Sequence, residues 1–138
     1  MGQRQYETGI FAMKHAGDLQ TQIRGCLAAL GISSPVDWDV LVFVYRHRAS
    51  LASSEQIAGM LGFPVAPVVD SLKSLESLQL IRSSRAPRGV SLYQIVSFDA
   101  SSPRHNCLRQ LMSLGNDREG RLHITRKLRR SETEGTNA

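Results

Sequence analysis

The stretch Leu51–Ser97, LASSEQIAGMLGFPVAPVVDSLKSLESLQLIRSSRAPRGVSLYQIVS, decides how this chain folds. A helix is predicted near its start, because Ser53 is a good N-cap residue and Gln56, three positions later, completes a capping box. The apolar face of that helix is predicted by residues at helical spacing, namely Ile57, Met60 and Leu61. Gly62 then provides the permissive backbone that a sharp turn requires.

A second helix and a pair of strands follow the turn. The helix is predicted by a stripe of apolar residues, which Ile81 could extend: Val68, Leu72, Leu75 and Leu78. After it, the segment 82–89 (RSSRAPRG) is polar and rich in turn residues. An alternating, strand-like run then begins with Val90, Leu92, Gln94 and Val96. The predicted order is therefore helix, turn, helix, and two short strands around a basic loop.

This order of elements resembles the winged helix-turn-helix domain of MarR-like bacterial transcriptional regulators. The residues that carry the resemblance are Leu51, Ile57, Ala58, Leu61, Gly62, Val68, Leu72, Leu75, Glu76, Leu78, Leu80 and Ile81. The resemblance implies a fold that is mainly α with a small β-wing and additional N- and C-terminal helices. It also implies a DNA-binding transcriptional regulator that acts as a homodimer on double-stranded DNA.

A chain of 138 residues is expected to form one domain. We expect that single winged-helix domain to span 1–130, with an N-terminal helical extension over 1–33. The winged helix-turn-helix core is expected over 34–98, and a C-terminal helix with a basic segment over 99–130. The basic segment either continues that helix or forms a fraying arm. The tail 131–138, SETEGTNA, is expected to be disordered.

The flanking helices have recognisable starting points. Two of them are predicted to begin at a serine cap followed by a proline, at Ser34-Pro35 and Ser102-Pro103. The first of these, predicted over 35–48, is apolar on most sides and should be the central helix of the core. Another helix is predicted over 19–30, and it either belongs to a dimer interface or covers the core of its own domain. A homodimer would use this helix together with the one after Pro103.

In helix-turn-helix regulators the second helix of the motif lies in the major groove. Its candidate DNA contacts here are four residues predicted to face outward: Pro67, Ser71, Lys73 and Ser74. Base-reading surfaces normally offer Arg, Lys, Asn or Gln, and this one offers a single lysine and small hydroxyls. Asp70 is predicted to face outward as well, where its charge would oppose phosphates. Serines still bond phosphates, and the wing could supply most of the affinity.

The predicted wing has more side chains that can bind nucleic acid than the second helix has. Its candidate contacts are Arg82, Ser84, Arg85 and Arg88. Three arginines without an acid in one short loop favour contact with phosphates or with a narrow minor groove. The alternative is an ordinary hairpin, whose charges keep a strand edge from aggregating.

The overall composition favours a polyanionic partner, since the net charge is +5 and the sequence pI is about 9.8. No apolar run reaches the length of a membrane span, and the N-terminus lacks the pattern of a secretory signal. We therefore expect a cytoplasmic protein with no membrane partner. Cys26 and Cys107 are expected to be buried free thiols rather than a disulfide.

No residue pattern predicts an enzyme. The four histidines are scattered, no C-x-x-C pair is present, and neither of the common phosphate-binding glycine motifs occurs. We therefore expect a regulator without catalytic residues, cofactors or metal ions.

Two alternatives to a DNA-binding regulator stay open. The first is a winged-helix protein–protein interaction module without sequence-specific DNA binding, which would use an apolar patch of Pro64, Val65, Pro67 and Val69. The second is a ligand sensor with a pocket between the central and terminal helices. The aromatic residues that could line that pocket, although core packing also explains them, are Trp38, Phe43 and Tyr45.

Overall fold

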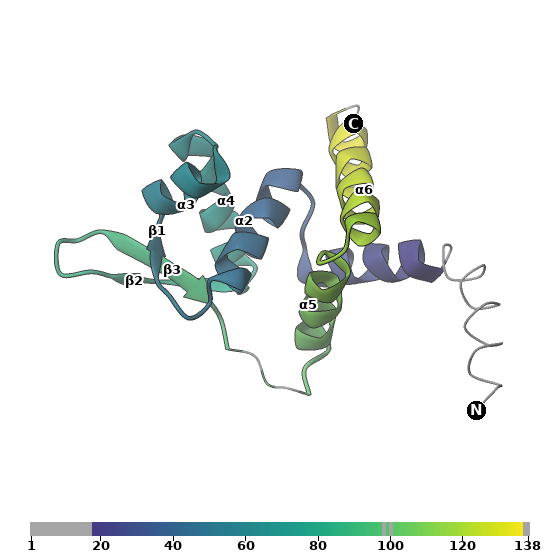
Figure 1. Ribbon diagram of the computed structural model, residues 1–138, viewed down its shortest axis with the longest axis horizontal. Coiled ribbons are helices and arrows are strands. Elements are labelled where there is room, and N and C mark those ends of the chain that lie inside the picture. The colour runs from purple at the N-terminus through teal and green to yellow at the C-terminus, as the bar shows by residue number, and fades with distance from the viewer. Residues whose placement is uncertain (1–17, 98, 100, 137–138) are drawn as a thin grey trace.

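The computed structural model describes residues 18–97, 99 and 101–136, so the predicted extension before Asp18 lies outside the described residues. The helices and strands, shown in Figure 1, are a helix Asp18–Leu30, α2 (Pro35–Arg46), β1 (Ala52–Ser53), α3 (Ser54–Leu61), α4 (Val65–Ser77), β2 (Ile81–Arg85), β3 (Ser91–Ile95), α5 (Pro103–Leu114) and α6 (Arg118–Thr136). The elements α2 to β3 form one part of the molecule. The helix Asp18–Leu30, α5 and α6 form the other part (Figure 1).

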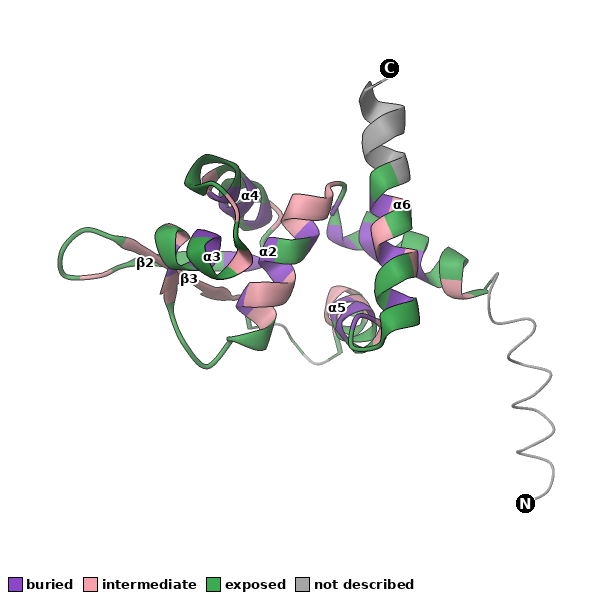
Figure 2. Ribbon diagram, turned by 45° about the horizontal axis from the view of Figure 1, so that its top comes forward, coloured by how far each residue is buried: buried purple, intermediate pink, exposed green. Residues whose placement is uncertain are grey.

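The central helix α2 starts where the sequence predicts. The Ser34 hydroxyl accepts a hydrogen bond from the Asp37 backbone N–H at 3.0 Å, and Pro35 occupies the first turn. The helix ends at Arg46, slightly before the predicted end at Arg48, and His47 is its C-cap. Four of its apolar side chains are buried in the core, namely Trp38, Val40, Leu41 and Val44. Figure 2 shows the buried residues on the inward faces of α2 and its neighbours.

The capping box at the start of α3 is confirmed. The Gln56 backbone N–H donates to the Ser53 hydroxyl at 3.2 Å, and the Ser53 N–H donates to the Gln56 side-chain oxygen at 2.9 Å. Gly62 closes the helix with φ of 74°, a left-handed conformation that favours glycine. The predicted apolar face is wrong at Met60, which is 71% exposed. The buried arc of α3 is centred on Ile57 and Ala58, and Met60 lies outside it.

The stripe of α4 is buried as predicted at its centre. Val68, Leu72 and Leu75 are fully buried, whereas Leu78, the C-cap residue, is half-buried. Leu61, the last residue of α3, is half-buried as well. The helix ends at Ser77, because Gln79 adopts a positive φ of 62° and the following backbone N–H groups bond back to the last turn. Those bonds join Gln79 N to the Glu76 carbonyl at 2.9 Å and Leu80 N to the Leu75 carbonyl at 3.0 Å, the pattern of a Schellman motif. Ile81 therefore begins strand β2 and does not extend the helical stripe.

The wing is part of a three-stranded antiparallel sheet with the order β1-β3-β2. The sequence predicted only its two long strands. The third, β1, comes from the link before α3 and pairs Ala52 with Tyr93. Strands β2 and β3 pair along their full length, from Ile81 opposite Ile95 to Arg85 opposite Ser91. The wing is thereby anchored to the start of α3.

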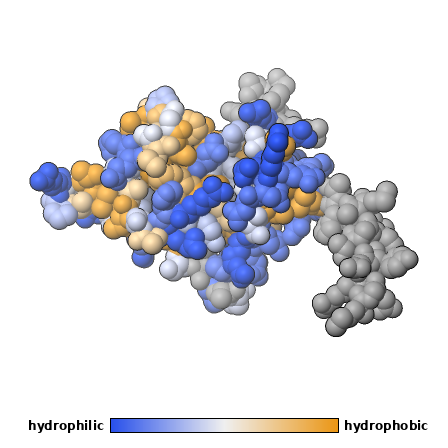
Figure 3. All heavy atoms as spheres, viewed as in Figure 1, coloured by the Kyte–Doolittle hydropathy of each residue, from blue (hydrophilic) through white to orange (hydrophobic). Residues whose placement is uncertain are grey.

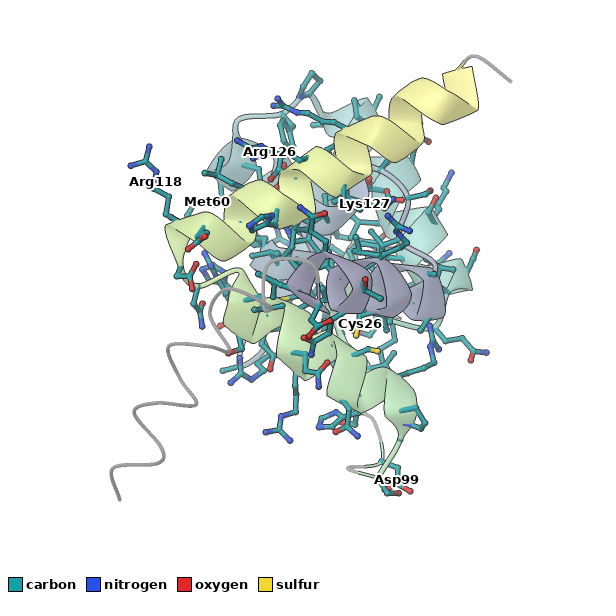
Figure 4. All side chains as sticks on the ribbon, turned by 90° about the vertical axis from the view of Figure 1, so that its right-hand side faces the viewer. Cys26, Met60, Asp99, Arg118, Arg126 and Lys127 are labelled. Carbon is teal, nitrogen blue, oxygen red and sulfur yellow. The ribbon has the colours of Figure 1, made fainter. Side chains whose placement is uncertain are left out.

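The second part of the molecule is a three-helix layer in which the helix Asp18–Leu30 lies between α5 and α6 (Figure 4). The inner residues of α5 and α6 are buried, namely Leu108, Leu111, Met112, Ile124 and Leu128. The two helices meet closely, since a Cβ atom added to Gly120 would lie 1.9 Å from the Leu114 carbonyl oxygen. Asp117 starts α6 by accepting the Gly120 N–H at 2.7 Å. The predicted basic segment is therefore a separate helix, neither a continuation of α5 nor a fraying arm.

The backbone of α6 is helical as far as Thr136, through most of the tail that the sequence predicted to be disordered. The prediction relied on the general tendency of terminal segments to be poorly ordered. However, the segment 131–134 (SETE) contains neither glycine nor proline. A helix that is already nucleated propagates through such residues at little cost, and this explains the difference.

The helix Asp18–Leu30 covers the core of its own chain with four buried side chains, Ile23, Cys26, Leu27 and Leu30. The packing role predicted for this helix is therefore confirmed, and its role in a dimer interface stays a prediction. Cys26 is buried, Cys107 is half-buried, and both are free thiols. Burial and the neighbouring Cys107 raise the pKa of the Cys26 thiol to about 12, which keeps it protonated.

Among the described residues, no single helix has the length and apolar character needed to cross a membrane. The helix Asp18–Leu30 and α2 together have enough length and apolar character for a span, but the chain bends by 83° between them.

Candidate nucleic-acid interface

The outward face of α4 is the first part of the candidate interface. Pro67, Lys73 and Ser74 are exposed, as predicted for DNA contacts, and Asp70 is exposed beside them. The exposed residues of α4 therefore carry one positive charge, Lys73, and two negative charges, Asp70 and Glu76, among small side chains.

Ser71 does not belong to this face, and its assignment as an outward DNA contact is wrong. Its side chain is 4% exposed, and its hydroxyl donates to the Asp37 carboxylate of α2 at 2.6 Å. Ser71 lies beside the buried stripe, one turn after Val68, so it faces α2 instead of solvent. Its hydrogen bond instead ties the two helices together.

The wing places its arginines differently from the sequence prediction. Arg82 and Arg85 lie on strand β2, and only Arg88 lies in the loop. Side chains alternate between the two faces of a strand, so Arg82 and Arg85, three positions apart, project to opposite faces. Arg85 shares its face with Ser83, whose hydroxyl donates to the Glu76 carboxylate of α4 at 2.7 Å. Arg85 is therefore on the α4 side of the hairpin.

Arg82 projects to the other face of the hairpin, together with Ser84. It lies opposite Gln94 on β3. With the Gln94 amide oxygen turned toward the guanidinium, that oxygen accepts from Nη2 and, at 2.7 Å, from Nε of Arg82. Arg82, Ser84, Arg85 and Arg88 are all exposed. The four predicted wing contacts are thus accessible, but they do not form one cluster.

The tip of the wing holds Arg88 in a tight turn. The Gly89 N–H donates to the Ala86 carbonyl at 2.9 Å, and the Ala86 N–H donates to the Val90 carbonyl at 2.8 Å. Pro87 occupies the second position of this turn, and Gly89 follows Arg88 with φ of 82°. The turn fixes the backbone of Arg88 at the far end of the hairpin.

Helix α3 adds an apolar residue, Met60, to the same surface, at a position that the sequence pattern predicted to be buried. Met60 and Val65 are 71% and 42% exposed, on either side of the turn at Gly62. Pro64 and Pro67 are exposed next to them. Figure 3 shows hydrophobic residues gathered on the surface over α3 and α4. The surface around the turn between α3 and α4, the exposed end of the motif, is therefore mainly apolar, whereas the wing carries the arginines.

Two clefts lie between α2 and the C-terminal helices, where the sequence placed a possible ligand pocket. The larger has a volume of about 640 Å³, and its lining includes Tyr45, Arg46, Arg48 and Arg109. Trp38 and Phe43 instead line a separate cleft of about 260 Å³. The three aromatic residues therefore do not share one pocket. Within the part of the chain that the structure describes, no group of three or more His, Cys, Asp or Glu side chains could hold a metal ion.

No family model matches the chain, and no curated protein matches it. Among solved structures, it is similar to a mutant of MepR from S. aureus bound to an oligodeoxyribonucleotide, with 17% identity, coverage of 94% of this chain and 91% of that chain, and a TM-score of 0.54. It is also similar to a second MepR mutant, from a multidrug-resistant S. aureus clinical isolate, with 16% identity, coverage of 94% and 90%, and a TM-score of 0.53. The mainly α architecture with a small wing is thus confirmed, and the chain has the MarR-like winged-helix fold.

Proposed function

We propose that this protein is a transcriptional regulator that binds double-stranded DNA through α4 and the wing. The observation that carries the proposal is the fold, which matches over nearly the whole chain that of a MepR mutant bound to an oligodeoxyribonucleotide. In helix-turn-helix proteins the second helix of the motif enters the major groove. Here that helix is α4, and its outward residues Pro67, Lys73 and Ser74 would lie against the DNA.

The wing supplies the charge that α4 lacks. Arg85 and Arg88 are exposed on the α4 side and at the tip of the hairpin, where they would reach phosphates next to the groove that α4 occupies. Arg82 and Ser84 project to the opposite face and would contribute less. Base-reading donors on α4 are few, so electrostatic contacts by the wing should carry most of the affinity.

We further propose that the protein acts as a two-fold homodimer. The helix Asp18–Leu30 and α5 lie outside the winged-helix part, and each keeps an exposed side after its buried residues have packed. A dimer through these helices would pair two copies of α4 with half-sites about one helical turn of DNA apart.

The competing function is a protein–protein interaction module, and one observation favours it. The exposed end of the motif combines the apolar residues Met60 and Val65 with the acidic Asp70. A surface of this kind suits a protein partner better than a phosphate backbone.

Fluorescence anisotropy with random-sequence and genomic duplexes, at several salt concentrations, separates the two functions. A regulator should bind duplexes with a salt-dependent affinity and two chains per site. Absence of binding below about 100 μM at low salt would favour the interaction module, since non-specific binding by DNA-binding proteins is normally at least this tight. Sedimentation at tens of micromolar should give a dimer, and a strictly monomeric species would contradict the dimer proposal alone.

A further inference from the structure

The first turn of α4 has no side chain that can hydrogen-bond to a base. Val65, Ala66 and Pro67 are exposed, and Val69 is half-buried at the start of the next turn. The N-cap residue of the helix is Pro64, whose side chain forms no capping hydrogen bond. In helix-turn-helix proteins, the N-terminal residues of this helix are the ones that contact base edges. The part of α4 placed to read DNA is therefore apolar.

An apolar side chain can recognise one feature of the major groove. Each base pair presents donors and acceptors there, and only thymine adds an apolar group, its 5-methyl. Resting on the proposed function, we infer that this protein discriminates DNA sequences through apolar contacts between Val65, Ala66 and Pro67 and the 5-methyl groups of thymine. Its preferred sites therefore contain T·A pairs where the first turn of α4 docks.

The other polar residues of α4 offer little further discrimination between bases. Ser74 is exposed, and its hydroxyl both donates and accepts, so it bonds base donors and acceptors alike. Ser71 is buried and bonded to Asp37. Asp70 lies a turn beyond Ala66, and a carboxylate there can accept only from the amino groups of cytosine and adenine. Lys73 lies further along, where a helix in the groove approaches the backbone. Thymine methyl groups remain the feature that the leading turn itself can distinguish.

The exposed apolar surface at this end of the motif is small. The exposed apolar residues at this end of the motif are Met60, Pro64, Val65, Ala66 and Pro67. These five side chains supply only part of the roughly 800 Å² per partner that a stable protein interface buries, polar and apolar surface together. They are sufficient, however, to cover one or two methyl groups.

The test exchanges thymine for deoxyuridine, which removes the methyl and leaves the hydrogen-bonding edge unchanged. A preferred duplex is first selected from a random-sequence pool with the full chain. Anisotropy is then measured on copies in which single thymines are replaced by deoxyuridine. At the positions contacted by α4, each lost methyl should weaken binding about fourfold, the effect of exposing one buried methylene-sized group.

Protein variants show whether Val65 makes this contact. Val65→Ala removes two methyl groups and keeps a good helix former, so circular dichroism should show an unchanged helical content. The deoxyuridine penalty is the loss of affinity when one thymine is replaced by deoxyuridine. If Val65 contacts the methyl group of one thymine, the Val65→Ala variant should show much less of this penalty than the wild type at that thymine, because the two groups then act as a coupled pair. Val90→Ala is the matched control, because Val90 is exposed to a similar extent (44%) but lies on the wing. It should keep the full penalty.

The outcomes separate this inference from the function on which it rests. Duplex binding with no deoxyuridine penalty at any position would overturn the inference and leave the proposed function intact. A penalty that Val65→Ala and Val90→Ala both leave unchanged would also overturn it, since the methyl would be read elsewhere. Failure to bind any duplex would overturn both.

Discussion

Removing two wing arginines should change the salt dependence of DNA binding by a predictable amount. Arg85 and Arg88 are exposed on the α4 side and at the tip of the hairpin, where each would neutralise one phosphate. Each such contact contributes about 0.9 to the slope of log K against log salt concentration. The Arg85→Ala, Arg88→Ala double variant should therefore have a slope that is shallower by about 1.8 units.

This change in slope predicts a measurable difference in affinity. Between about 50 and about 200 mM salt, the wild type should lose about tenfold more affinity than the double variant. The assay is anisotropy with one random-sequence and one genomic duplex at five salt concentrations. Binding to both duplexes should weaken together, because phosphate contacts carry no sequence information.

Arg82→Ala is the matched control for this experiment. It removes the same charge from the same strand, but from the opposite face, where Gln94 binds the guanidinium. Its slope should change less than that of Arg85→Ala alone. An unchanged slope in the double variant would refute the assignment of the wing as a phosphate-binding element. An equal effect of Arg82→Ala would refute the argument from strand faces.

Three further predictions concern α4. Leu72→Ala should lower the free energy of unfolding by about 2–5 kcal/mol in urea titrations, because Leu72 is fully buried and the site would retain a cavity. Ser71→Ala should lower it by about 1–3 kcal/mol through loss of the bond to Asp37, without changing sequence preference; an altered preference would mean that Ser71 reaches DNA. Asp70→Asn should strengthen binding to all duplexes by about twofold to fivefold, and weaker binding would place Asp70 on a base.

The features predicted correctly from the sequence are local ones. The capping box of Ser53 with Gln56 and the left-handed turn at Gly62 depend on residues within a few positions of each other. Their geometry is therefore readable from spacing alone. The buried stripe through Leu72 follows likewise from helical periodicity, which is set by the backbone.

The incorrect predictions concern residues whose burial or orientation depends on an element that is distant in the sequence. Ser71 is polar and lies at the edge of the apolar stripe, so only the position of α2, with Asp37, reveals that it is buried. Arg82 and Arg85 lie in a polar segment that predicts a loop, but pairing with β3 makes them part of a strand. Because a strand alternates its side chains, spacing by three separates charges that a loop would gather. The sequence shows how many arginines the wing carries but not the face of the hairpin that each one occupies.

The structure separates the charged and apolar parts of the candidate interface, and salt affects the two differently. Ionic contacts by Arg85 and Arg88 weaken as salt rises, because each counterion that they release gains less entropy in a more concentrated salt solution. Apolar contacts by Val65 with a thymine methyl do not involve counterions. The ratio of affinities for a thymine duplex and its deoxyuridine copy should therefore stay constant while both affinities fall with salt. With the charge on the wing and the apolar surface on α4, affinity and selectivity are set by different elements, and each can be altered without the other.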